Sequence, residues 1–308
     1  MQTILGSGGI IAQEASFCLS EHTDKIRQVS RYPKKVNDSD QIFPANLKSE
    51  SEVRLAVKDS SIVYLTVGLP YDTKTWSEFW PLIMRNTITA CKEHQAKLVF
   101  FDNVYMYGKV DGWMTEDTPF NPCSKKGEVR AQIAEMLLHE MKNGNIDAQI
   151  VRSADFYGPK ASNTYIAPMV FDKLAKGKKP QLILTSESKH SFTFTPDAAR
   201  AMVLLGNSDE AYGQTWHLPT DSKVLTGEEF VEISAEIFGV QNKYIILKSG
   251  MIKMASWFSP VIQETKEMLY QFKYDYLFDS SKFQKQFFEA TSYQKGIAII
   301  FNTQYKNK

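Results

Sequence analysis

Apolar residues in the first half of the chain follow two alternating patterns. Short apolar runs, typical of strands buried on both faces, alternate with longer segments in which apolar residues recur every three or four positions, as on one face of a helix. The runs cover residues 2–5, 26–29, 62–67, 98–101 and 148–151, and the helical patterns cover residues 11–19, 80–91 and 129–137. This alternation predicts an α/β fold with a doubly wound parallel sheet of the Rossmann type.

The second half of the chain is less regular. Thr226, followed three residues later by Glu229, predicts a capped helix start. Ser259 and Pro260 predict a second helix, with the serine as its cap, that runs through Tyr270. We therefore expect a dinucleotide-binding Rossmann domain over residues 1–165 plus about 195–215, and a smaller C-terminal α+β substrate-binding cap over residues 166–194 and 216–308.

Composition and charge exclude several classes of protein. A net charge of +1 over 308 residues leaves no concentrated positive surface, so no nucleic-acid partner is expected. Cys18, Cys91 and Cys123 are far apart and show no ligand spacing, so no metal site is expected. The sequence has neither a signal-peptide pattern nor a membrane-spanning run, which predicts a cytoplasmic protein without a membrane partner.

A glycine-rich segment separates the first predicted strand from the first predicted helix. Gly6 permits a tight turn, and Gly8 and Gly9 let the backbone approach a pyrophosphate closely. The helix that follows offers unpaired N–H groups and a favourable dipole. The segment therefore predicts a dinucleotide site, and its residues are Gly6, Ser7, Gly8, Gly9, Ile10 and Ile11.

The end of the second predicted strand selects the cofactor. An NAD site normally places a carboxylate there for the ribose 2′-hydroxyl, but this chain reads Ser30-Arg31 and continues to Lys35. Ser30 can donate a hydrogen bond to a 2′-phosphate, Arg31 can pair with that phosphate and stack on adenine, and Lys35 adds positive field. The sequence therefore predicts NADP in preference to NAD.

Several segments, taken in order, resemble the extended short-chain dehydrogenase/reductase superfamily, in its NAD(P)-dependent epimerase/dehydratase group. They are the turn at Gly6, Thr66-Val67-Gly68, Asn86, Tyr105-Met106-Tyr107-Gly108, residues 152–159 and residues 194–197. The resemblance implies further cofactor contacts from Asn46, Leu47, Thr66, Val67, Gly68, Phe156 and Tyr157. It also implies a homodimer built on the helices at residues 80–91 and 129–141.

The expected catalytic segment departs from the family pattern. The family uses a Tyr that exchanges a proton with the substrate, a Lys four residues later, and a Ser or Thr that orients the substrate. Aligning Gly127 with the glycine that follows the family Tyr puts Lys126 and Arg130 in the first two places, and the serine place falls on Asn103. A second alignment would put Gly127 and Ala131 in the two places. We prefer the first, because it keeps two cationic groups where two functional groups belong.

Three explanations of this departure stay open. Lys126 can be the proton donor while Asn103 holds the substrate oxygen. A tyrosine from elsewhere, such as Tyr105 or Tyr157, can reach the same point. The protein can also bind NADP without turnover, as a regulator or scaffold.

Tyr71 and Trp76 follow a predicted strand at its carboxyl end, where open α/β folds bind ligands, and the resemblance puts His190 and His217 in segments that the superfamily uses around the substrate. The expected substrate contacts include these residues and two further tyrosines. They are Tyr71, Trp76, Tyr105, Tyr165, His190 and His217. The sequence therefore favours an NADP-binding oxidoreductase for a small carbonyl or sugar-nucleotide substrate, with a non-catalytic NADP-binding regulator as the alternative.

Overall fold

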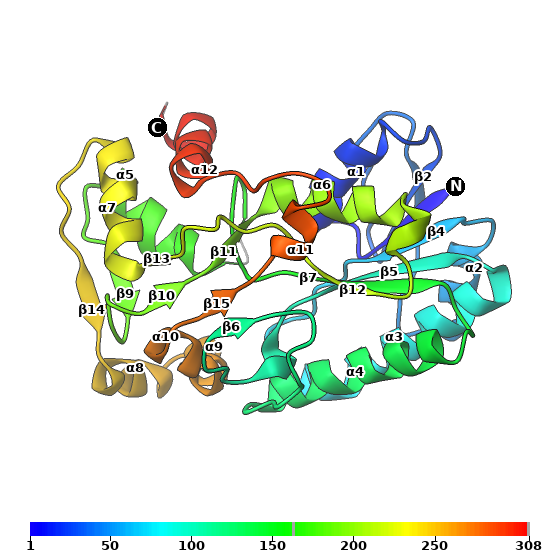
Figure 1. Cartoon of the computed structure of the whole chain (residues 1–308), viewed down its shortest axis with the longest axis horizontal. Helices are drawn as coiled ribbons and strands as arrows, with labels where there is room; N and C mark the ends of the chain where they lie inside the picture. Colours follow the sequence, from blue (N-terminus) through cyan, green and yellow to red (C-terminus); the bar gives the residue numbers. More distant parts are fainter. Residues whose placement is uncertain (162–163, 307–308) are drawn as a thin grey trace.

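The computed structural model describes residues 1–161 and 164–306. Its centre is a seven-stranded parallel sheet with the order β12-β7-β5-β4-β1-β2-β3 (Figure 1). The strands are β1 (Gln2–Leu5), β2 (Ile26–Ser30), β3 (Gln41–Pro44), β4 (Ile62–Leu65), β5 (Lys97–Asp102), β7 (Ala148–Arg152) and β12 (Thr215–His217). Every residue of β1, β4 and β7 is buried, as expected for strands covered on both faces. The doubly wound fold predicted from the sequence is confirmed.

Helices cover both faces of this sheet. One face carries α1 (Ile10–Leu19) and α6 (Thr195–Gly206), and the other carries α2 (Glu50–Val57), α3 (Thr73–His94) and α4 (Lys125–Lys142). Each layer has its own apolar core: Ile4 and Tyr64 belong to the first, and Leu5 and Leu65 belong to the second. Successive side chains of one strand thus point to opposite faces of the sheet.

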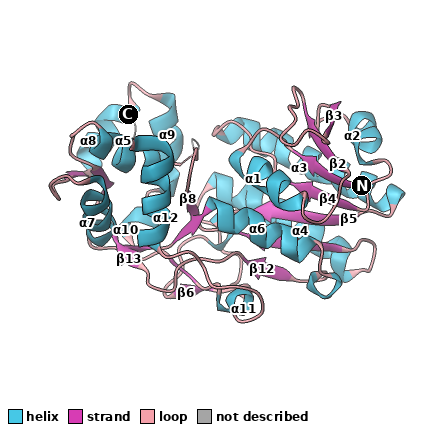
Figure 2. Cartoon of the chain, turned by 90° about the horizontal axis from the view of Figure 1, so that it is seen from above, coloured by secondary structure: helices cyan, strands magenta, loops and turns pink. Residues whose placement is uncertain are grey.

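A smaller unit lies beside the sheet (Figure 2). Its helices are α5 (Asp172–Ala175), α7 (Gly227–Phe238), α8 (Ser249–Ser256), α9 (Pro260–Thr265), α10 (Tyr270–Lys273) and α12 (Tyr293–Ile300), while α11 (Ser281–Gln284) contacts β12. Four two-stranded pairs connect it: β8 (Asp155–Tyr157) with β11 (Phe192–Phe194), β9 (Gln181–Ile183) with β14 (Ile245–Leu247), β10 (Lys189–His190) with β13 (Leu225–Thr226), and β6 (Trp113–Met114) with β15 (Leu277–Phe278). Phe192 and Phe230 lie in its aromatic core.

Two helix starts predicted for the second half are present, but one of these helices is shorter than predicted. Thr226 and Glu229 form a complete capping box at the start of α7. The Ser259 hydroxyl caps α9, yet α9 ends at Thr265 and the chain tightens into a 3-10 turn before α10 begins. The prediction of one helix through Tyr270 is therefore wrong. The change of helix type falls in the segment whose carboxylates turn inward to Lys126.

The topology places a binding edge at the carboxyl ends of β1 and β4. The connections from these two central strands run to opposite sides of the sheet, which makes a crevice where open α/β folds bind ligands. In residues 1–161 and 164–306 no helix is both long enough and apolar enough to cross a membrane.

Candidate functional site

The glycine turn after β1 has the backbone geometry that only glycine adopts easily. Gly6 and Gly8 have φ angles of +99° and +113°. A Cβ at Gly6 would stand 2.4 Å from the Val67 Cα, so this glycine also lets the ends of β1 and β4 approach each other. Among the described residues, Gly8 and Gly9 have nothing within 4 Å of an added Cβ. A ligand can therefore approach the backbone here.

The start of α1 is suited to a phosphate group. Gly9 is its N-cap and provides no side-chain cap, and no acidic residue lies in the first turn. The first N–H groups of a helix have no intrahelical partners and attract anions. The Ser7 hydroxyl is buried without a hydrogen-bond partner among the described residues. An unpartnered hydroxyl beside free helix N–H groups fits a bound pyrophosphate.

The loop after β2 presents basic side chains on an ordered backbone. Arg31 and Lys35 are exposed, and the Lys35 ammonium donates to the Asp38 carbonyl at 2.8 Å. The buried Asp40 carboxylate organises this loop by accepting from the amides of Val36 and Asn37 at 2.9 and 3.1 Å. Burial raises the pKa of Asp40, but these hydrogen bonds outweigh it and leave the pKa below its ordinary value.

The Asp40 carboxylate also ties this loop to the core. It accepts a hydrogen bond from the Gln28 amide at 2.9 Å, and the same amide donates to Ser16 on α1 at 2.6 Å. Sequence reasoning missed Asp40. The loop that carries Arg31 is therefore held by buried polar contacts from the sheet and from the first helix.

The expected adenine and ribose contacts follow β3 and β4. Asn46 is exposed, while Leu47 is buried and its carbonyl accepts from the Asn86 amide at 3.0 Å. The Thr66 hydroxyl donates to the Leu5 carbonyl at 3.3 Å, beside the glycine turn. Val67 and Gly68 follow it on the same edge. Thr66, Val67 and Gly68 thus follow β4 at the carboxyl edge that carries the turn, whereas Asn46 and Leu47 follow β3 at the end of the sheet.

The two aromatic residues expected near the nicotinamide lie in different environments. Phe156 is half-buried and packs against Phe101, 5.8 Å between ring centroids. Tyr157 is fully buried in the aromatic core of the smaller unit, 5.3 Å from Phe194. Burial raises the pKa of the Tyr157 hydroxyl well above its ordinary value. Its surroundings are those of a core side chain, with no open path for a ligand.

Lys126 lies at the start of α4 and is fully buried. Its ammonium has four oxygen neighbours: the hydroxyl of Thr73 at 2.8 Å, the carbonyl and carboxylate of Glu264 at 3.1 and 2.6 Å, and the carboxylate of Glu267 at 2.9 Å. An ammonium has only three protons to donate. Every proton of Lys126 is therefore engaged, and the side chain fastens the C-terminal segment to the Rossmann domain.

Arg130 is also buried and engaged. Its Nε donates to the Asp102 carboxylate at 2.7 Å, a second bond from Nη2 reaches the same oxygen, and the guanidinium lies 4.3 Å from the Trp80 ring. Asp102 ends β5, and its carboxylate also accepts a hydrogen bond from the backbone amide of Asn103 at 2.9 Å. The position of Asn103 therefore depends on this ion pair.

A second arginine faces the same carboxylate. The Arg152 Nε lies 3.8 Å from Asp102, and Nη1 donates to the Tyr107 hydroxyl at 2.7 Å. Arg152 is almost completely buried, and neither its Nε nor its Nη2 has a hydrogen-bond partner among the described residues. Sequence reasoning missed Asp102 and assigned no role to Arg152.

His217 is a buried structural residue that continues this network. Its Nε2 accepts from the Tyr107 hydroxyl at 2.9 Å, and its Nδ1 donates to the Asp279 carbonyl at 2.7 Å. Burial lowers the pKa of His217 to about 3, so the ring is neutral. Its side chain is completely buried, which leaves it no surface for the expected substrate contact.

Three aromatic residues gather where β4 and β5 end. Trp76 is buried, donates to the Pro70 carbonyl at 2.9 Å, and stacks on Tyr105 with ring centroids 6.2 Å apart. The half-buried Tyr71 meets Trp76 edge-on, and its hydroxyl is near enough to that of Tyr105 for each to affect the pKa of the other. Burial raises the pKa of both hydroxyls, so both stay protonated. Each hydroxyl can therefore donate a hydrogen bond to a ligand.

Asn103 lies next to this group. Its side-chain oxygen accepts from the Tyr105 amide at 3.1 Å, which fixes the backbone before the tyrosine. Among the described residues, the nitrogen of its side-chain amide has no hydrogen-bond acceptor, so it can donate to a ligand. Lys126 lies on the other side, 4.6 Å from the Tyr71 ring. The structure thus brings Lys126, Tyr71, Tyr105 and Asn103 together at the carboxyl edge of the sheet.

His190 and Tyr165 form a separate aromatic group around Asp155. The His190 Nε2 is 3.0 Å from the Asp155 carboxylate, and its ring stacks on Tyr276 at 4.4 Å. Tyr165 meets His190 edge-on. The Asp155 carboxylate is near enough to Tyr105, Tyr165 and Tyr276 to contribute, after burial, to their raised pKa values.

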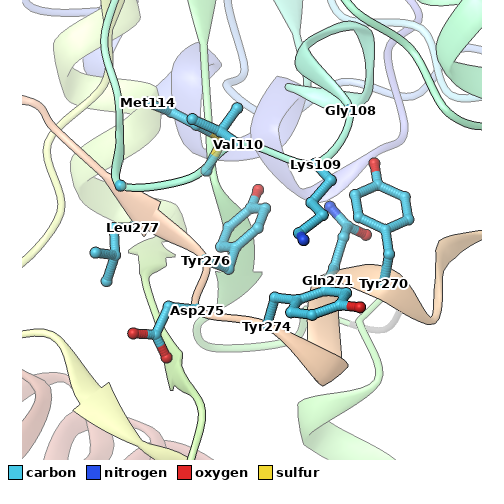
Figure 3. Close-up of a pocket in the computed structure, with 11 residues that line it drawn as sticks. Gly108, Lys109, Val110, Met114, Tyr270, Gln271, Tyr274, Asp275, Tyr276 and Leu277 are labelled. Atoms are coloured by element: carbon cyan, nitrogen blue, oxygen red, sulfur yellow. The ribbon is translucent and has the colours of Figure 1, made fainter.

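A small cavity lies behind Tyr276 (Figure 3). Its volume is about 10 Å³, which is enough for a single water molecule. The Lys109 ammonium covers the ring of Tyr274 at 3.8 Å on its wall. This cavity is too small for an organic substrate.

Solved structures with the same fold include several sugar-nucleotide enzymes. MoeE5, solved with UDP-glucose and NAD, is 18% identical with a TM-score of 0.80, covering 99% of both chains. UDP-glucose 4-epimerase of Thermus thermophilus, solved with NAD, is 16% identical with a TM-score of 0.78, covering 99% of this chain and 100% of that one. DesIV of Streptomyces venezuelae, a dTDP-glucose 4,6-dehydratase, is 14% identical with a TM-score of 0.79, covering 100% and 98%.

At these identities the structures establish the fold, while sequence comparison establishes the family. No curated protein sequence matches the chain significantly. The sequence profile of the NAD dependent epimerase/dehydratase family, however, matches residues 3–218, which include the glycine turn, β1 from its second residue and the other six strands of the central sheet. The chain belongs to the NAD-dependent epimerase/dehydratase family, within the extended short-chain dehydrogenase/reductase superfamily.

Proposed function

We propose that this protein is an NADP-binding oxidoreductase of the epimerase/dehydratase type with a non-standard catalytic site. The observation that carries the proposal is the phosphate-binding turn. The buried Ser7 hydroxyl lacks a partner among the described residues, beside an uncapped helix start and two open glycines. A pyrophosphate would accept hydrogen bonds from the N–H groups of that helix start and from the Ser7 hydroxyl.

The basic loop after β2 supports NADP in particular. Ser30 and the exposed Arg31 follow the strand where an NAD site would carry a carboxylate. Lys35 adds a positive charge, and Asp40 holds the loop in place. The similar structures named above were solved with NAD, so the preference for the phosphorylated cofactor rests on these residues of the present chain.

The substrate would lie against Tyr71, Tyr105 and Asn103. The bound cofactor supplies or accepts a hydride at its nicotinamide ring. The hydroxyls of Tyr71 and Tyr105 stay protonated, and either can donate a hydrogen bond that polarises a substrate carbonyl. Lys126 would act as a positioning residue, because its protons are all engaged. The substrate class we propose is a small carbonyl compound or a sugar nucleotide.

A second candidate function is NADP binding without turnover. The observation that favours it is that both groups in the family's catalytic places are committed to protein partners, Lys126 to two glutamates and Arg130 to Asp102. A protein of this kind would report the cofactor level through its conformation or its partners. Binding and turnover measurements separate the two candidates.

The test is a fluorescence titration with NADPH and with NADH. The wild-type protein is expected to prefer NADPH, and Arg31→Asp should lose about 10- to 100-fold in NADPH affinity, as for a lost charge-assisted hydrogen bond. Lys178→Asp is the matched control, because Lys178 is an exposed lysine of the smaller unit and the change in charge is the same. Unchanged NADPH binding by Arg31→Asp would refute the cofactor assignment.

Turnover is then measured as NADPH oxidation against a panel of carbonyl compounds and sugar nucleotides. Oxidation that falls in a Tyr105→Phe variant supports the enzyme and the role of the tyrosine pair. Tight NADPH binding without oxidation of any panel member supports the second candidate.

A further inference from the structure

The α8–α9 hairpin carries a cluster of exposed apolar side chains. Met251, Met254, Trp257, Phe258 and Val261 have exposed fractions of 46%, 58%, 71%, 84% and 66%. We call these five residues the α8–α9 patch. Large apolar side chains that are exposed singly are ordinary, but a contiguous exposed patch marks an interaction surface.

The hairpin that presents the patch is an ordered element. Ile252 and Ser256 on the inner side of α8 are buried, and the Ser259 hydroxyl caps α9. The backbone amides of Trp257 and Phe258 donate to the carbonyls of Met254 and Ala255, respectively, in the preceding turn. The two aromatic side chains therefore project from a fixed turn between two helices. Figure 1 places α8 at the outer corner of the smaller unit.

The exposed charges around the patch are positive. Lys243, Lys248 and Lys253 are exposed in the same segment. The carboxylates that follow, Glu264 and Glu267, turn inward and pair with Lys126. The outer surface of the hairpin thus combines aromatic and thioether groups with cations.

We propose that the α8–α9 patch attaches the protein peripherally to an anionic lipid surface. Trp and Phe favour the depth of the headgroups, and flanking lysines are attracted to acidic lipids. The sequence led us to expect no membrane partner because it has no spanning segment, but attachment at the interface needs none. The proposal does not depend on the cofactor or on turnover.

A second copy of the chain fits this patch less well. A twofold contact through the same surface on both copies would bring Lys248 and Lys253 of each copy toward those of the other. Like charges brought together oppose such a contact, whereas an anionic surface neutralises them. The charge pattern therefore selects the lipid surface over self-association.

The experiment is co-sedimentation of the full chain with vesicles. One set contains equal parts of phosphatidylserine and phosphatidylcholine, and the other contains phosphatidylcholine alone. Wild-type protein is expected to bind the anionic vesicles at low salt, to bind the neutral vesicles weakly, and to be released by high salt.

Two variants test the two components of the patch. Trp257→Ser combined with Phe258→Ser removes the apolar part, and Lys248→Glu combined with Lys253→Glu reverses the charge. Each is expected to weaken binding about tenfold or more. All four positions are exposed, so the fold should persist, and circular dichroism checks this. Leu55→Ser is the matched control, because Leu55 is 58% exposed on α2, outside the patch.

Three results would overturn the proposal. One is no binding of the wild-type protein to anionic vesicles at low salt. Another is binding that neither double variant weakens. The third is a lipid-free dimer, seen by sedimentation equilibrium, that disappears in the Trp257 and Phe258 double variant, because a second copy would then occupy the patch.

Discussion

The ion-pair cluster of Lys126 gives a prediction with an asymmetric outcome. The lysine side chain has an exposed fraction of 0%, whereas Glu264 and Glu267 are 26% and 23% exposed. Replacing both glutamates by leucine strands a cation in the interior, which costs about 3–5 kcal/mol of unfolding free energy. Replacing Lys126 by methionine strands two carboxylates that still reach water, so the expected loss is about 1–3 kcal/mol.

Urea unfolding of the full chain measures both losses. A triple variant with methionine at position 126 and leucine at positions 264 and 267 removes every charge of the cluster, and it should recover at least half of the loss of the double glutamate variant. If Lys126→Met proves as destabilising as the double glutamate variant, the buried cation is not the costly element and the reasoning fails. NADPH binding by Lys126→Met should stay close to that of the wild type, because Lys126 holds the C-terminal segment and not the cofactor turn.

Two further predictions concern groups with shifted pKa values. Asp40 has a lowered pKa in the folded protein, so its contribution to stability is present above the ordinary carboxyl pKa and is lost as the pH falls through the folded value. Asp40→Asn should cost about 1–3 kcal/mol at neutral pH, weaken NADPH binding and flatten that acid-side loss; unchanged NADPH affinity would contradict its role in the loop. His217, with a pKa of about 3 against 6.5 for an ordinary histidine, refuses a proton that the unfolded chain accepts, so stability should fall as the pH drops below about 6.5. His217→Asn should reduce this slope in urea unfolding between pH 7 and pH 5, and an equal slope in both proteins would refute the neutral buried ring.

The Rossmann half of the chain was predictable because its signals are local. Strands buried on both faces appear in the sequence as continuous apolar runs, and the glycine turn lies directly between a strand and a helix. Helix α2 was missed although its start carries a signal: Ser49 caps it by accepting from the Glu52 amide. Glu52 departs from a full capping box, because its carboxylate accepts from the Asn46 amide instead.

The contacts of Lys126 and Arg130 could not be predicted, because they join segments that are distant in the sequence. Glu264 lies 138 residues beyond Lys126 in the chain, and nothing in the sequence around either residue indicates the other. The pair of Asp102 and Arg130 also joins two elements, the end of β5 and the middle of α4. Pairing of this kind depends on how the C-terminal segment packs, which the period of apolar residues does not encode.

Lys126 and Arg130, which we align with the family's Tyr and Lys, are each coupled to other parts of the fold. Lys126 fastens the C-terminal segment, and Arg130 neutralises the carboxylate of Asp102, which in turn fixes the Asn103 amide. Arg152 is a second buried cation near the Asp102 carboxylate. If Arg130 were removed, Asp102 would therefore still have a cationic neighbour and could shift toward it. Lys126 and Arg130 thus support the fold and the residues beside the proposed substrate position. We therefore propose that any proton transfer in this protein uses groups whose protons are not engaged, and that the hydroxyls of Tyr71 and Tyr105, which burial keeps protonated, are the candidates at the carboxyl edge.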